Sequence, residues 1–105
     1  MTFIKIAEAN QVADGVVKKF IVKDKIIAVA NVGGEFFVID DTCSHAKCSL
    51  SRGRLSGKEL ACPCHGAKFD VKTGKALTLP ATLPVEMYEV KLEGSDVLVN
   101  LNPRG

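Results

Sequence analysis

All cysteines and histidines of the chain lie in two short blocks, and these residue types bind soft metals. The first block covers residues 43–48 (CSHAKC), and the second covers residues 62–66 (CPCHG). Residues 46–61 separate the first histidine from the first cysteine of the second block. Thiolate and imidazole together select zinc, copper or iron–sulfur centres. The sequence therefore predicts one metal centre built from two loops.

The order of the candidate ligands along the chain indicates which kind of metal centre they form. Each block places a cysteine ahead of a histidine, as Cys43-x-His45 and Cys62-x-x-His65. Structural zinc sites usually take their cysteines as Cys-x₂₋₄-Cys pairs, so a single zinc fits this order poorly. Two ligands from adjacent positions of a tight loop suit two metals side by side, with the cysteines on one iron and the histidines on the other. A zinc site with the same four ligands and a purely structural disulfide protein are the less favoured alternatives.

The elements that must position these blocks are predicted to be strands. Runs rich in Val and Ile alternate with turn signals, and Gly33-Gly34 is typical of a tight hairpin because both central positions need positive φ. Residues 8–15 are predicted to form a loop or a single helical turn, and no convincing amphipathic helix is present. The predicted strands cover residues 3–7, 16–22, 26–32, 35–40, 67–71, 85–92 and 96–101, with a possible short strand at 59–61.

These patterns predict a single all-β domain over residues 1–105. We expect a small antiparallel sandwich or partly closed barrel that carries the cysteine loops at one end. Residues 41–66 show almost no helix or strand periodicity, and a loop region this long in a small domain is usually functional or disordered. Because it contains every Cys and His, the functional interpretation is favoured.

Charge and hydropathy exclude several classes of function. The net charge of +2 on 105 residues is too small to indicate binding to nucleic acid or to an anionic membrane. The chain contains no run of eighteen apolar residues, which is about the length that a helix needs to span a bilayer. Its N-terminus lacks the pattern of a signal peptide. We therefore expect a cytoplasmic protein, in which cysteines favour metal binding or catalysis over a disulfide framework.

Basic residues concentrate around the two blocks. Residues 47–75 contain seven basic and two acidic residues, a local balance of +5. This segment is either a solvated, lysine-rich surface or a weak docking patch that speeds encounter with an acidic partner. Lys47 and Lys68 are the candidate docking residues.

The two blocks resemble the motif of the Rieske [2Fe–2S] family. The resemblance covers most of the chain and includes Leu50-Ser51-Arg52-Gly53, Phe69-Asp70, Thr73-Gly74 and a proline loop at Pro80. It implies a cluster-binding subdomain over about residues 41–84 and one [2Fe–2S] cluster. It also implies that Cys43 and Cys62 bind the inner iron, that His45 and His65 bind the outer iron, and that Pro80 shields the other side of the cluster.

The resemblance also gives a role to the remaining cysteines. In the Rieske proteins of cytochrome bc complexes, cysteines at the positions of Cys48 and Cys64 form a disulfide between the two cluster loops. The implication is the same bond here, although two free thiols in a reducing cytosol are the alternative.

Two positions depart from the high-potential Rieske pattern. High-potential members tend to carry a serine and a tyrosine whose hydroxyls donate hydrogen bonds to the cluster sulfurs. Ala67 and Phe69 stand at these positions and cannot donate. Fewer donors should lower the reduction potential, so the resemblance implies a value in the lower part of the Rieske range.

The function that follows is a soluble, monomeric Rieske-type ferredoxin and not an enzyme. It would carry one electron from a reductase to an acceptor such as a Rieske oxygenase. The alternative is a non-catalytic subunit of a larger redox enzyme, similar to the small subunit of nitrite reductase. A respiratory bc-complex subunit is disfavoured by Ala67, Phe69 and the lack of an N-terminal membrane helix.

Overall fold

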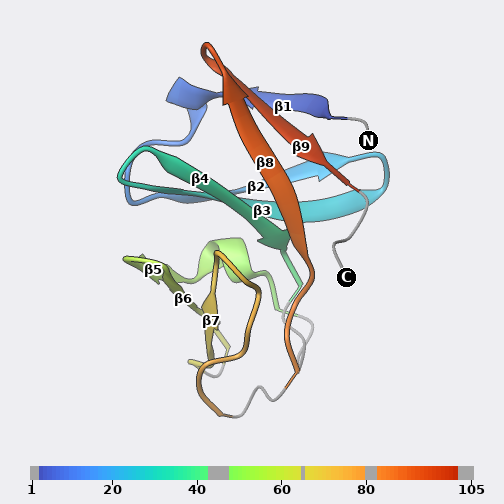
Figure 1. Ribbon diagram of the computed structural model, residues 1–105. Helices are drawn as coiled ribbons and strands as arrows, with labels where there is room; N and C mark the ends of the chain where they lie inside the picture. Colours follow the sequence, from blue (N-terminus) through green and yellow to red (C-terminus); the bar gives the residue numbers. More distant parts are fainter. Residues whose placement is uncertain (1–2, 43–47, 65, 80–82, 102–105) are drawn as a thin grey trace.

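The computed structural model describes residues 3–42, 48–64, 66–79 and 83–101, and this part of the chain consists mainly of antiparallel strands (Figure 1). Its elements in chain order are β1 (Ile4–Glu8), the 3₁₀ turn η1 (Ala9–Gln11), β2 (Val17–Val22), β3 (Lys25–Val32), β4 (Glu35–Asp40), the 3₁₀ turn η2 (Leu50–Arg52), β5 (Arg54–Ser56), β6 (Glu59–Ala61), β7 (Lys68–Asp70), β8 (Met87–Glu93) and β9 (Asp96–Asn100). The all-β prediction is confirmed.

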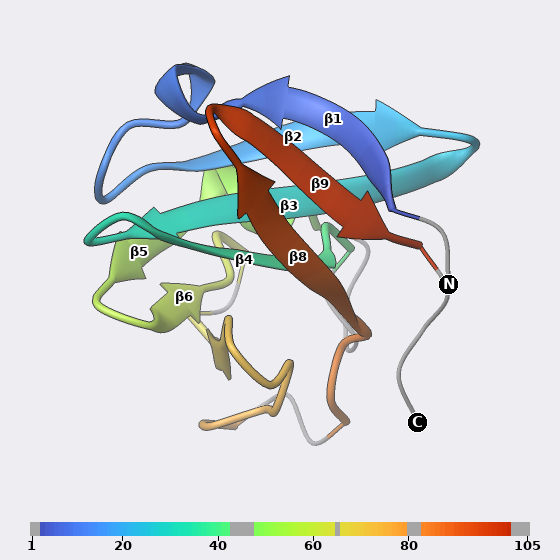
Figure 2. The ribbon, with the colours of Figure 1, turned by 45° about the horizontal axis from the view of Figure 1, so that its top comes forward.

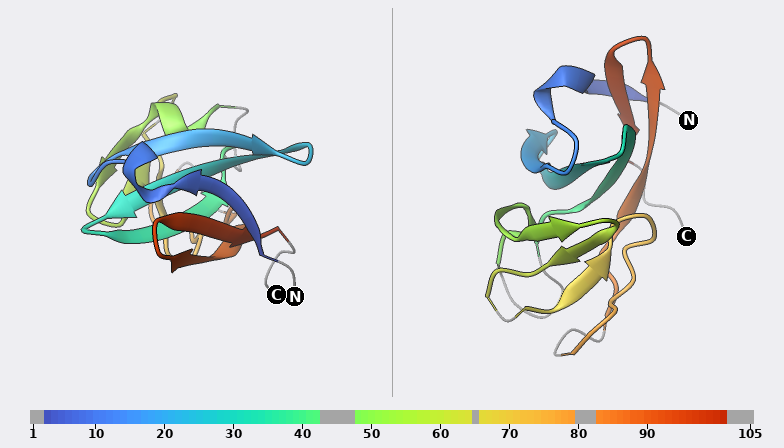
Figure 3. Two further views of the ribbon diagram at one scale, coloured as in Figure 1. Left: turned by 90° about the horizontal axis from the view of Figure 1, so that it is seen from above. Right: turned by 90° about the vertical axis from the view of Figure 1, so that its left-hand side faces the viewer.

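The strands form a large sheet and a small one. The large sheet has the order β1-β9-β8-β4-β3-β2, and the small sheet has the order β5-β6-β7. The large sheet curls until its edge strands β1 and β2 approach each other, which makes a nearly closed barrel (Figure 2). The small sheet lies at one end of the molecule, as the side view in Figure 3 shows. Of the two predicted architectures, the structure has the partly closed barrel.

Apolar side chains fill the inside of the barrel. Val97 and Val99 of β9 are completely buried, and they point to the same side of the sheet because successive side chains of a strand alternate between its faces. They pack with Ile27 and Val29 of β3 and with Val38 of β4. The barrel core therefore joins the last strand of the chain to β3 and β4.

Strand β3 is buried on both of its faces. Ile27 and Val29 point into the barrel, whereas Ala28 and Ala30 belong to a second core between the barrel and the small sheet. Alanine is short enough for the small sheet to approach the β3 backbone closely. The second core also contains buried residues of β4, of the small sheet and of the segments that adjoin it, namely Ile39, Leu50, Leu60, Cys62, Ala67, Phe69, Val71 and Val85.

Two hairpin turns contain residues with positive φ, and the sequence predicts only one of these turns. Gly33 and Gly34 have φ values of 62° and 94°, so the prediction of positive φ at both is confirmed. Lys23 and Asp24, between β2 and β3, also have positive φ although neither is glycine. Aspartate tolerates this conformation better than most residues, and the tight β2–β3 pairing holds Lys23 in it.

The region between the two cysteine blocks has more structure than the sequence predicts. The possible strand at residues 59–61 is confirmed as β6, whereas η2 and β5 were not predicted. A strand of three residues such as β5 is too short to show a period. It forms because β6 pairs with it and because Leu55 packs against the second core.

Both helical turns in the described part of the chain have only three residues, so neither could cross a membrane.

Gly74 allows a close contact that closes the segment after β7. Its φ is +79°, and a Cβ atom there would lie 2.2 Å from the carbonyl oxygen of Val85. Gly57, at the tip of the β5–β6 hairpin, has a φ of +58° with no neighbour within 4 Å of such a Cβ. We expect Gly57→Ala to lower the free energy of unfolding by about 1 kcal/mol through the backbone conformation alone. Gly74→Ala should lower it by about 1–3 kcal/mol more because of the clash.

Urea unfolding followed by circular dichroism measures both losses. Equal losses in the two variants would contradict the contact between Gly74 and Val85.

Candidate metal centre

The thiol of Cys62 is held in the second core by a tight loop. Cys62 follows β6 directly and is only 2% exposed. Its backbone N–H donates to the carbonyl of Ala67 (2.6 Å), and its carbonyl accepts from the N–H of Gly66 (2.9 Å). Gly66 has a φ of +75°, which lets the chain turn within a few residues. The loop between β6 and β7 is thus closed at its base, with a free thiol directed into a region sheltered from water.

A disulfide joins the two cysteine blocks. Cys48 and Cys64 are bonded across a sequence separation of 16, with their Cα atoms 6.4 Å apart. Cys48 is half-buried and Cys64 is exposed. The predicted bond is confirmed, and it holds Cys48, which follows residues 43–47, close to Cys64, which precedes residue 65.

The carboxylate of Asp41 closes the base of the first loop. Asp41 is 3% exposed, and its side chain accepts hydrogen bonds from the Ser49 hydroxyl and from the backbone N–H of Ser51 (2.8 Å). Its backbone carbonyl accepts from the N–H of Leu50 (2.6 Å), and Thr42 forms a bridge to Ser49. One buried carboxylate therefore fixes the residues before and after the segment 43–47.

Asp40, which precedes Asp41, connects the start of the first loop to strand β8 of the barrel. Asp40 accepts a hydrogen bond from the Tyr88 hydroxyl (2.7 Å), and its N–H donates to the carbonyl of Glu86 (2.9 Å). Burial raises the pKa of the Tyr88 hydroxyl well above its usual value, and the hydrogen bond and negative charge of Asp40 raise it further. Tyr88 therefore stays protonated as a donor, so β8 remains fixed to the end of β4.

Ala67 and Phe69 lie in the same core as Cys62, and neither side chain has a hydroxyl group that could donate a hydrogen bond there. Both are completely buried in the second core with Cys62. Ala67 is bonded to Cys62 through the backbone, and Phe69 pairs with Leu60 and bridges to Ala76. Neither side chain can donate a hydrogen bond toward the loop that contains Cys62.

Several predicted site residues lie outside the part of the chain that the structure describes. They are Cys43, His45, His65, Pro80 and Lys47. Lys68 is described and exposed, and its amine lies 3.9 Å from the carboxylate of Glu59. Among the described residues no three Cys, His, Asp or Glu side chains gather as a metal site, since most predicted ligands are not among them.

The donor chemistry of the described part still fits an iron–sulfur group. A buried, unoxidised thiol lies in a core of apolar side chains, and the second pair of cysteines is already used in a disulfide. Because Cys62 forms no disulfide, its sulfur remains available as a soft metal ligand. Cys62 can therefore serve as a ligand, whereas Cys48 and Cys64 cannot.

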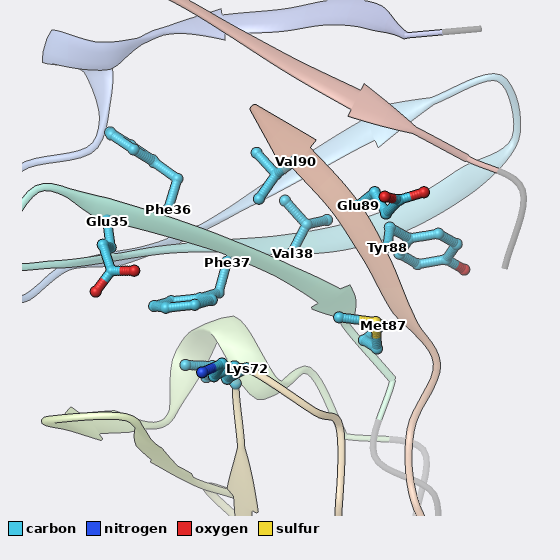
Figure 4. Close-up of a pocket in the computed structure, with 10 residues that line it drawn as sticks. Glu35, Phe36, Phe37, Val38, Lys72, Met87, Tyr88, Glu89 and Val90 are labelled. Carbon is cyan, nitrogen blue, oxygen red and sulfur yellow. The ribbon is translucent and has the colours of Figure 1, made fainter. Parts of the chain in front are cut away.

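A groove at the junction of the barrel and the small sheet does not share this chemistry. It has a volume of about 300 Å³, and Figure 4 shows Phe37 of β4 and Met87 of β8 above Lys72, which follows β7. Glu35 and Glu89 also line it, and its described lining contains no Cys or His residue. The described lining therefore offers no thiolate or imidazole ligand.

Comparison with known proteins decides the family. A Rieske [2Fe–2S] domain matches residues 2–89. The chain belongs to the Rieske [2Fe–2S] family. The ferredoxin component of biphenyl 2,3-dioxygenase from Rhodococcus jostii (strain RHA1) is 48% identical over 101 residues, which cover 96% of this chain and 94% of the relative.

Solved structures agree with this result. The ferredoxin of carbazole 1,9a-dioxygenase from Nocardioides aromaticivorans IC177 matches with a TM-score of 0.90 and 35% identity, over 94% of this chain and 97% of that one. A chain from the complex of reduced oxygenase and oxidized ferredoxin in carbazole 1,9a-dioxygenase matches with a TM-score of 0.90 and 33% identity, over 97% of this chain and 95% of that one.

This Rieske protein is therefore a ferredoxin-type electron carrier and not a catalyst, with a Rieske-type [2Fe–2S] cluster as its cofactor. The predictions of family, cofactor and carrier function are confirmed, in preference to a nitrite reductase-type subunit.

Sequence reasoning missed the residues that close the first loop. The sequence patterns assign no role to Asp41 or Ser49, and Ser51 is named only within the segment Leu50-Ser51-Arg52-Gly53. An acidic residue that follows a strand just ahead of a ligand block, with two serines beyond the block, is the signal that could have indicated them.

Removing the Asp41 carboxylate should destabilise the fold. Asp41→Ala leaves the Ser51 N–H and the Ser49 hydroxyl without their acceptor, so we expect the free energy of unfolding to fall by about 3 kcal/mol. Asp41→Asn keeps one carbonyl oxygen for the Ser51 N–H and should lose clearly less. Chemical unfolding of both variants measures the difference, and an Ala variant as stable as the wild type would exclude this role.

Removing the disulfide should have a comparable cost. A loop of 16 residues contributes about 3 kcal/mol in the chain-entropy model, so the double variant Cys48→Ser/Cys64→Ser should unfold at correspondingly lower denaturant concentration. Wild-type protein treated with a thiol reductant serves as the control and should approach the variant. A variant that keeps the stability of the oxidised wild type would show that the bond does not constrain the loops.

Proposed function

We propose that Cys43, Cys62, His45 and His65 bind the [2Fe–2S] cluster, the cysteines on the inner iron and the histidines on the outer iron. The observation that carries the proposal is the buried free thiol of Cys62, held next to the disulfide that joins both blocks. Two thiolates and two neutral imidazoles are the ligand set of Rieske centres. When bound, the cluster accepts and releases one electron, and the protein groups supply the sheltered site.

The protein delivers electrons from a reductase to an acceptor such as the Rieske oxygenase of a dioxygenase system. Relatives that match nearly the whole chain are named ferredoxin components of dioxygenases, and one neighbour comes from a complex with its oxygenase. The chain works as a monomer in the cytoplasm, where it meets these partners transiently. Residues 1–105 form one domain, and about residues 41–84 form its cluster-binding subdomain.

Lys47 and Lys68 contribute to docking in this proposal. Lys68 forms an exposed ion pair with Glu59, but exposed pairs contribute little binding energy in water, so the Lys68 amine can still interact with a partner.

We also propose that Pro80 shields the cluster on the side away from the two blocks.

A reconstituted assay tests the function. The protein is loaded with iron and sulfide and then replaces the ferredoxin component in the Rhodococcus jostii biphenyl 2,3-dioxygenase. We expect an EPR signal with the low average g value of Cys₂His₂ ligation, and product formation that depends on this protein. Cys62→Ser, which removes a ligand, is the control and should abolish both. A colourless protein that contains zinc, or a reduced protein that no oxygenase oxidises, would reject the proposal.

The reduction potential should lie in the lower part of the Rieske range, which spans about −150 to +300 mV. Ala67 and Phe69 are completely buried in the core with Cys62, so no side-chain hydroxyl at these positions stabilises the reduced state. Ala67→Ser and Phe69→Tyr should each raise the potential. Protein-film voltammetry measures it, and a wild-type value above about +200 mV would contradict the assignment.

A further inference from the structure

A cavity of about 410 Å³ opens beside the disulfide, at the end of the molecule that carries the cysteine loops. Strand β2 of the barrel packs against η2 there, so two segments that are distant in the sequence form its walls. Its described lining consists of Lys19, Cys48, Ser49, Arg52, Pro63 and Cys64.

The cavity has an excess of positive charge. Lys19 and Arg52 are both exposed, and neither forms an ion pair with any residue that the structure describes. No described lining residue is acidic.

One carboxylate lies behind the cavity wall, and it does not cancel this excess. Asp41 is 3% exposed and accepts hydrogen bonds from Ser49 and Ser51, so its negative charge is directed inward. Two cations and one carboxylate leave a local balance of +1, with both cations on the solvent side.

The cavity is also close to the proposed ligands. Cys64 is separated from Cys62 by Pro63 alone, and His65 is its other neighbour. Consecutive Cα atoms are about 3.8 Å apart, so the Cα atoms of Cys62 and Cys64 lie within about 8 Å of each other. A partner group seated in the cavity would therefore be brought close to the cluster.

We propose that this cavity receives a carboxylate side chain from an acidic surface of the redox partner. The inference rests on the proposed function, and it specifies the side from which a partner approaches. The planar guanidinium of Arg52 can bind a carboxylate through two parallel hydrogen bonds, and Lys19 adds a second positive charge. Such pairing orients the partner and speeds encounter.

Electron transfer to small charged oxidants tests the charge of this site without a protein partner. The loaded protein is reduced chemically and mixed with trianionic ferricyanide or with tricationic hexaammineruthenium. The test variant is Lys19→Glu/Arg52→Glu. Its matched control is Lys18→Glu/Lys23→Glu, which changes the net charge equally at two other residues of the β2 strand and its turn.

We expect the test variant to react about fivefold more slowly with ferricyanide than the control does at low ionic strength, and faster than the control with hexaammineruthenium. The difference should nearly vanish at about 1 M salt, where charges more than about 3 Å apart are screened. Equal rate constants in the test and control variants would overturn the proposal.

Binding of a labelled hexaglutamate peptide, followed by fluorescence polarisation, tests carboxylate recognition independently of electron transfer. Wild type and control should bind the peptide at low salt, and the test variant should bind at least about tenfold more weakly. The milder variant Lys19→Gln/Arg52→Gln, which removes charge without reversing it, should lie between them. Equal binding by all variants would reject the cavity as a docking site, whereas failure of the oxygenase assay alone would reject the proposed function.

Discussion

Burial of β3 on both faces is the constraint on which the rest of the structure depends. Its Ile27 and Val29 help to fill the barrel, while Ala28 and Ala30 form the wall of the second core. Because the two sets alternate along one strand, a shift of one residue in register would exchange the two faces and disrupt both cores. Pairing with β2 on one side and β4 on the other fixes this register. The small sheet therefore takes its position from the barrel.

The second core extends this constraint to the metal centre. Cys62, Ala67 and Phe69 pack in the same cluster of buried side chains as Ala28 and Ile39. The residue that can ligate iron and the residues that can tune it thus lie in one close-packed unit with the barrel wall. An electron carrier benefits from such a site, since ligands held by packing and by backbone hydrogen bonds keep their geometry.

The loops are also anchored by interactions other than apolar packing. Asp41 closes the first loop through buried hydrogen bonds, the Cys62–Ala67 backbone bond closes the second, and the disulfide joins the two. These are three different interactions: a charged acceptor, a backbone pair and a covalent bond. Their combination leaves a polar, positively charged flank at Lys19 and Arg52 for contact with other molecules, because the Asp41 carboxylate points inward.

Short-range patterns in the sequence determined much of this protein. Runs of Val and Ile specified the barrel strands, Gly33-Gly34 specified a hairpin, and the spacing of Cys and His indicated an iron–sulfur centre. The pairing of Cys48 with Cys64 followed from resemblance, because spacing alone leaves several pairings open.

Only the tertiary structure decided which distant residues meet. The two-sided burial of β3 and the placement of Lys19 and Arg52 beside one cavity depend on contacts between segments far apart in the chain. The short strand β5 and the hydrogen bonds of Asp41 depend on contacts across a turn and a loop that the sequence pattern does not reveal. A periodic pattern reports which face of one element is buried, but it does not report what covers that face. That information arises only when the barrel closes and the small sheet packs against it.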